Sequence, residues 1–143
     1  MDLPAEVIAL AFQEGDIFFF EKNCPIGIPE HMHVCIRKHN TILLLSTCSS
    51  QIDTSIKIAQ RRGYPAATYP VFNADNTNKF EKSETYVNCN EVVEVEADVF
   101  QNYISTGKIH LLKGKMDTTA LDKIADGIRQ STVIEGKYKD MFL

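Results

Sequence analysis

Hydrophobic and polar residues alternate most regularly between residues 31 and 37. Side chains of a strand alternate between its two faces, so this stretch predicts a strand with one apolar face and one chemically rich face. The first face carries Met32, Val34 and Ile36, and the second carries His31, His33, Cys35 and Arg37. A polar turn at 38–40 and an apolar run at 41–46 follow, which predicts an antiparallel hairpin.

Shorter signals precede this hairpin. Residues 4–12 favour a short helix, with Pro4 in its first turn and Gly15 as its stop signal. Phe18, Phe19 and Phe20 lie in a run of strand length, and we expect them in the core with at least one facing outward. The prolines and glycine of residues 24–29 predict a loop that leads into the histidines.

The second half of the chain predicts further strands and two clear helices. Alternation over 86–95 and the apolar residues 109–112 indicate strands, and residues 98–105 indicate a helix closed by Gly107. A longer helix begins at a cap, Asp117 or Thr118, and ends near Ser131. Its apolar stripe consists of Leu121, Ile124, Ala125 and Ile128. Residues 136–142 indicate a last helical turn, and we expect 53–83 to be irregular with one or two short strands.

These elements predict a mainly β chain with appended helices, an α+β fold, in one domain spanning 1–143. A hydrophobic content of 44% with 24% charged residues is that of a globular domain rather than a disordered one. The sequence has neither a membrane-spanning run nor an export signal at its start, so we expect a cytoplasmic protein. The four cysteines, Cys24, Cys35, Cys48 and Cys89, are irregularly spaced and are expected to be free thiols.

The order of short motifs along the chain suggests a family. A Gly15-Asp16 pair opens the aromatic strand, His31-Met32-His33 opens the next, and Cys48-Ser49-Ser50-Gln51 ends the aliphatic one. Tyr86-Val87-Asn88 and the late helices complete the order. In this order the chain resembles the MazF/PemK/Kid-like toxins, in particular uncharacterised members with a His-x-His strand. The resemblance covers most of the chain except 53–83.

The resemblance implies a small SH3-like barrel that cuts RNA without a metal, within a toxin–antitoxin system. It also implies a homodimer that accepts an antitoxin peptide and binds single-stranded RNA, with no cofactor and no metal. One departure matters, because Met32 stands where the family has its catalytic Arg. Ser49 and Gln51 match the family's pattern after the cysteine.

For RNA cleavage, a base must remove the proton of the ribose 2′-hydroxyl and an acid must protonate the leaving oxygen. His31 and His33 are the acid and base candidates, because histidine transfers protons near neutral pH. Arg37 would stabilise charge on the same face, while Ser49 and Gln51 would act as orienting hydrogen-bonding groups. The RNA-binding candidates are Lys38, Arg61 and Arg62, and the last two are also candidates to replace the missing Arg.

Three other interpretations stay open. Alternate positions of His31, His33 and Cys35 would suit zinc, although the following Arg37 and Lys38 do not complete a cupin-type ligand set. A non-catalytic barrel that binds a protein partner is the second, and it is favoured by the net charge of −4, which argues against broad charge-driven binding of nucleic acid. The third is a decayed toxin that serves as an antitoxin-sequestering subunit or as a DNA-bound regulatory subunit.

Overall fold

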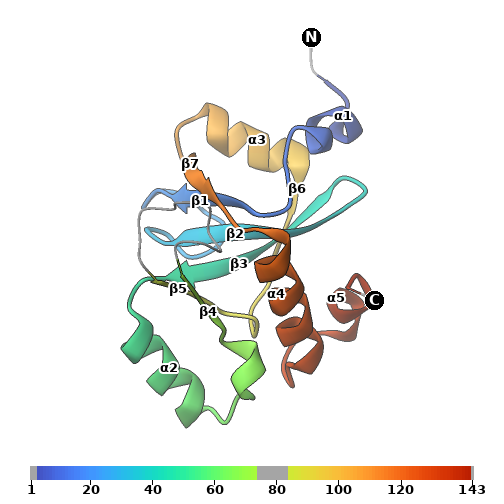
Figure 1. Ribbon diagram of the computed structural model, residues 1–143. Helices are drawn as coiled ribbons and strands as arrows, with labels where there is room; N and C mark the ends of the chain where they lie inside the picture. Colours follow the sequence, from blue (N-terminus) through green and yellow to red (C-terminus); the bar gives the residue numbers. More distant parts are fainter. Residues whose placement is uncertain (1–2, 74–83, 143) are drawn as a thin grey trace.

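The computed structural model describes residues 3–73 and 84–142, with residues 5 and 6 described by their backbone only. It contains one antiparallel sheet with helices on both faces (Figure 1). The polar stretch 74–78, which the sequence places in an irregular region, lies outside the described residues. No helix within the described ranges is long and apolar enough to cross a membrane.

Three strands in chain order form the centre of the sheet. They are β1 (Asp16–Phe20), β2 (Met32–His39) and β3 (Ile42–Ser49), and each is antiparallel to the next. The β2–β3 hairpin is confirmed, but its turn is tighter than expected because Lys38 and His39 still belong to β2. Asn40 takes a positive φ of 55° at the turn, a conformation that Asn tolerates better than most residues.

The remaining strands extend the sheet on both sides. β7 (Ile109–Lys115) pairs with β1, whereas β5 (Glu84–Val87) and β6 (Val93–Glu96) pair with successive parts of the free edge of β3. β4 (Val71–Asn73) pairs with β5 and forms one end of the sheet, and β7 forms the other. The described strands therefore form an open sheet. The α+β fold is confirmed, whereas closure into a barrel is not seen among these strands.

Two helical layers cover opposite faces of the sheet (Figure 1). On one face, α1 (Ala5–Leu10) and α3 (Ala97–Ser105) cover a core that contains Phe18, Phe20 and Phe100. On the other face, α4 (Thr118–Gln130) and α5 (Gly136–Asp140) cover a core that contains Ile17, Val34 and Leu44. Phe19, between two fully buried phenylalanines, is partly exposed, which confirms that one aromatic residue of β1 faces outward.

The late helices agree with the sequence pattern. Asp117 caps α4 by accepting a hydrogen bond from the Ala120 N–H at 2.8 Å. Ile124 and Ile128 are fully buried in the core beneath α4, because apolar residues three and four apart share one face of a helix. Gly107 has a φ of 76° just after α3, as expected for a residue that closes a helix.

Two expectations are wrong. Residues 52–61 form an amphipathic helix, α2 (Ile52–Arg61), followed by the short 3-10 helix η1 (Ala66–Thr68), where irregular structure is expected from the sequence. The short strand expected in the same region is confirmed by β4. Gly15 does not stop the first helix, which already ends at Leu10. Its φ of 98° instead serves the turn into β1, where its N–H donates to the Cys35 carbonyl at 2.7 Å.

Candidate functional site

His33 lies in the interior of the sheet, on the face covered by α1 and α3. It is fully buried and stands opposite Thr47 on β3. Its ring stacks on Phe20, with the ring centroids 3.9 Å apart and the planes 14° from parallel. The Ile28 N–H donates to His33 Nε2 at 3.3 Å, so the neutral ring carries its proton on Nδ1.

The loop before β2 closes over this imidazole. Gly27 has a φ of 62°, and a Cβ atom at this position would lie only 2.9 Å from His33 Nε2 and would collide with the Phe20 ring. Burial lowers the pKa of His33 to about 4, since a charged imidazole would lose its hydration there. His33 is therefore a neutral packing group at neutral pH, which does not suit the acid and base role expected for it.

Arg37 lies on the opposite face of the sheet from His33. The pairing of β2 with β3 shifts at Ile36, because Cys35 pairs with Leu45 while Arg37 pairs with the adjacent Leu44. Such a bulge inserts one unpaired residue and reverses the alternation of side chains beyond it. The expectation that Arg37 shares a face with the two histidines is thus wrong.

The contacts of Arg37 are with the second helical layer. Its guanidinium lies 4.7 Å from the centre of the Phe142 ring, and its Nη1 is 3.7 Å from a carboxylate oxygen of Glu14. Phe142 is buried in the core beneath α4 and α5. Arg129 Nη1 also donates to the Phe142 carbonyl, at 2.6 Å. These contacts make Arg37 an anchor for the segment that follows α5.

His31 and Ser49 lie at one end of the hairpin. Met32 pairs with Cys48, so the next residue of β3, Ser49, comes beside the start of β2, as the antiparallel register predicts. His31 is exposed, and its carbonyl accepts the Phe20 N–H at 3.1 Å. Ser49 Oγ accepts the N–H of Gln51 at 3.0 Å, and the exposed Gln51 directly precedes α2.

The three basic candidates are spread over different elements. Lys38 donates from Nζ to the Ala9 carbonyl of α1 at 3.4 Å, so it ties the first helix to β2. Arg61 and Arg62 are exposed at the C-terminal end of α2, the helix that sequence reasoning missed. Burial raises the pKa of Tyr86 on β5, and the positive charge of nearby Arg62 partly offsets this effect.

The zinc interpretation finds no matching geometry. His33 and Cys35 are buried beneath α1 and α3, while His31 is exposed before the strand begins. In the ranges that the structure covers, no group of three or more His, Cys, Asp or Glu side chains is arranged to hold a metal ion.

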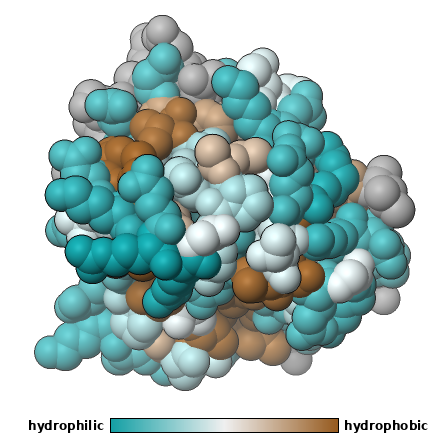
Figure 2. Space-filling model, turned by 90° about the horizontal axis from the view of Figure 1, so that it is seen from below, coloured by the Kyte–Doolittle hydropathy of each residue, from teal (hydrophilic) through white to brown (hydrophobic). Residues whose placement is uncertain are grey.

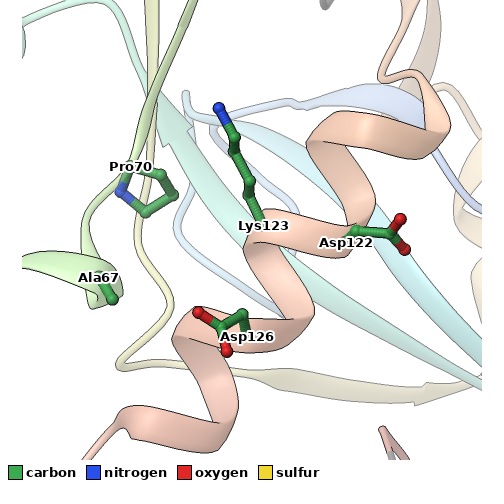
Figure 3. Close-up of a pocket in the computed structure, with 5 residues that line it drawn as sticks. All are labelled: Ala67, Pro70, Asp122, Lys123 and Asp126. Carbon is green, nitrogen blue, oxygen red and sulfur yellow. The ribbon is translucent and has the colours of Figure 1, made fainter.

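A pocket that sequence reasoning did not indicate lies between η1 and α4 (Figure 3). It has a volume of about 300 Å³, and its lining residues are Ala67, Pro70, Asp122, Lys123 and Asp126. Figure 3 shows Lys123 extended along the pocket toward Pro70, while Asp122 points away. Asp126 already accepts a hydrogen bond from Gln130 at 2.8 Å, so this pocket offers no distinct set of reactive groups.

Comparison with known proteins does not identify a family for this chain. No family model matches the chain, and the search of curated proteins finds no relative.

Proposed function

We propose that this chain is a non-catalytic binding module for a protein partner, built on a small SH3-like barrel. The observation that carries the proposal is the enclosure of His33 between Phe20 and the loop at Gly27. A general acid or base must reach the reacting group within about 2.6–3.2 Å, directly or through one water. A histidine covered by its own loop holds the fold together and transfers no proton to a substrate.

The placement of Arg37 supports the same proposal. Phosphodiester cleavage needs a cation beside the crowded phosphate, and the family's Arg position is occupied by Met32. Arg37 is engaged by Phe142 and Glu14 on the other face of the sheet, so it does not replace that group. The net charge of −4 likewise favours a protein segment over RNA as the partner.

The resemblance to toxins gives the proposal a biological setting. The partner would be an extended peptide of the antitoxin kind, and the protein would work in the cytoplasm. Four free, buried thiols agree with a reducing compartment. Closure of the barrel would require the ends of the sheet, at β4 and β7, to approach each other through segments outside the described strands.

A second candidate function is metal-independent cleavage of RNA centred on His31. It is favoured by one observation: the β2–β3 register puts the exposed His31 and Ser49 at the same end of the hairpin. In this case single-stranded RNA would be the substrate, with Gln51 as a hydrogen-bonding neighbour and with Lys38, Arg61 and Arg62 as RNA-binding candidates.

One experiment separates the two functions. Purified protein is incubated with single-stranded RNA in the presence of a metal chelator, and the products are analysed for cyclic phosphate ends. The binding-module proposal predicts no cleavage by wild-type protein and none by His31→Ala. Cleavage with cyclic ends that falls about a hundredfold or more in His31→Ala would overturn it and establish the second candidate. His39→Ala, which alters an exposed histidine at the other end of β2, is the matched control.

A further inference from the structure

Strand β7 forms one end of the sheet, and one of its two edges has no strand beside it. Among the described strands it pairs only with β1 (Figure 1). The Glu21 N–H donates to the Lys108 carbonyl at 2.8 Å, so residues in phase with Lys108 direct their backbone groups toward β1. The N–H and C=O of Leu111, which is out of phase, therefore point away from β1. No described residue forms a hydrogen bond with them.

The accessible part of this edge is the segment 110–113. Leu111 is 60% exposed, and His110 and Lys113 are exposed as well. Ile109 and Gly114, on either side of the segment, are buried. Backbone groups at a sheet edge pair readily with another extended chain. The segment thus offers an added strand two backbone hydrogen bonds at Leu111 and contact with a large apolar side chain.

The titratable side chains of β7 are all basic. The strand contains His110, Lys113 and Lys115 and no acidic residue. His110 Nε2 lies 2.8 Å from Glu21 Oε1, and Lys115 Nζ donates to Gln13 Oε1. Lys113, by contrast, makes no hydrogen bond or ion pair within the described part of the chain. The accessible edge therefore carries an uncompensated positive charge, although the net charge of the protein is −4.

We propose that β7 accepts an extended, acidic segment of a partner protein as an additional strand of the sheet. Another peptide backbone supplies both an acceptor for the Leu111 N–H and a donor for its carbonyl, and acidic side chains would lie beside Lys113. The inference rests on the proposed function and deepens it, since it assigns the partner segment a place, a backbone conformation and a charge. It requires the sheet to stay open at β7, as it is among the described strands.

Charge and hydrogen bonding select among the partners that could reach this edge. Like charges on neighbouring strands repel, so the lysines disfavour pairing of β7 with an identical edge. The phosphates of an RNA strand would be attracted to Lys113, but they accept hydrogen bonds only and leave the Leu111 carbonyl without a donor. The end of the molecule seen in Figure 2 has hydrophobic residues only in small groups separated by hydrophilic ones, so it presents no broad apolar surface as an alternative.

Fluorescence anisotropy with two labelled peptides tests the proposal. One peptide alternates valine and glutamate, and the other alternates valine and lysine. We expect wild-type protein to bind the glutamate peptide, more weakly as salt is added, and not to bind the lysine peptide. Lys113→Glu should weaken binding of the glutamate peptide by about tenfold or more and should allow the lysine peptide to bind.

Two controls separate strand addition from the attraction of charge alone. Lys57→Glu makes the same charge change at an exposed position of α2 and should bind both peptides like wild type. The glutamate peptide with every backbone nitrogen methylated keeps its charge but has no N–H groups for pairing, so it should not bind. Circular dichroism establishes that both variants are folded.

Three results would overturn the assignment to β7. They are equal binding of the methylated and unmethylated peptides, an unchanged affinity in Lys113→Glu, and no binding of the glutamate peptide at millimolar concentration. Tighter binding of a single-stranded RNA oligonucleotide that is lost in Lys113→Glu would show that the strand binds phosphate instead. The proposed function is tested separately, because it fails only if wild-type protein cleaves RNA in the assay above.

Discussion

The imidazole of His33 lies between the ring of Phe20 and the loop that carries Gly27, with the Ile28 N–H on its Nε2. Its Nδ1 is buried without a hydrogen-bond partner in the described structure. Protonation would put a hydrogen on Nε2, which carries none in the neutral ring and toward which the Ile28 N–H already points. The charged ring would thus lose both its hydration and this hydrogen bond, and the folded state resists protonation.

This environment predicts a loss of stability in mild acid. The folded-state pKa of His33 is about 4, whereas the ordinary value is 6.5, so the unfolded chain takes up the proton first. The stability that the neutral His33 gives the folded state is fully present above pH 6.5, and it is lost as the pH falls toward 4. Between about pH 7 and pH 5 the free energy of unfolding should fall by about 2 kcal/mol through this residue.

Urea unfolding at the two pH values measures this decline. In His33→Phe the decline should be smaller by about that amount, because phenylalanine preserves the stacking area but does not titrate. His39→Gln changes an exposed histidine and should behave as wild type. Equal declines in wild type and His33→Phe would show that His33 does not oppose folding in acid.

Residue identity in the sequence indicated which side chains are chemically capable, but not where they lie. The period of two correctly separates Val34 from His33. It does not reveal that the 24–30 loop closes over His33, because that contact depends on the φ of Gly27 and on the packing of Phe20. His31 and Ser49 were placed at one strand end correctly, since an antiparallel register follows directly from a short turn.

At the scale of elements, α4 is the best determined by its sequence. A side-chain cap at Asp117 and an uninterrupted apolar stripe both mark it. Helix α2 has the weaker signals: Gln51 makes no side-chain cap, and Ala59 is its only buried residue. The loop-forming residues that follow Arg62 favour irregular structure for the whole region, so the amphipathic pattern of this helix alone does not predict it.

The packing of α4 on the sheet predicts a large effect of charge at Ile124. This side chain is fully buried in the core below the helix, so Ile124→Asp should lower the free energy of unfolding by at least about 3 kcal/mol. Thr119→Asp, at an exposed position in the same helix, should change it by less than about 0.5 kcal/mol. Urea denaturation compares the two variants, and similar losses in both would contradict the packing assigned to α4.

At the scale of the whole molecule, the sheet separates two apolar layers, one under α1 and α3 and one under α4 and α5. The sequence predicted the α+β composition because each element carries its own pattern. The strand order β4-β5-β3-β2-β1-β7 was not predictable in this way. It depends on which distant strands pair along the same edge. The sequence patterns of β5 and β6 are similar, and they do not show that the two strands pair with different parts of β3.

Both layers contain buried thiols, and this predicts how they react. All four cysteines are free and buried, and burial raises the pKa of Cys35 and of Cys48 to about 12. Since the thiolate is the reactive form, a disulfide reagent such as DTNB should label native protein slowly and all four thiols at once in denaturant. A fast-labelling thiol in the native state would contradict this burial. An intact mass that lacks two hydrogens after alkylation would indicate a disulfide.

The bulge at Ile36 also divides β2 into two halves that are out of phase. Before it, Cys35 lies in the core under α1 and α3, whereas Arg37 after it lies against Phe142, which follows α5 on the other face. A chain that lacked this single residue would turn the guanidinium into the core under α1 and α3 and withdraw it from Phe142. The length of this strand is therefore constrained as strictly as its composition, and relatives that preserve the fold should keep the same number of residues between His33 and Arg37.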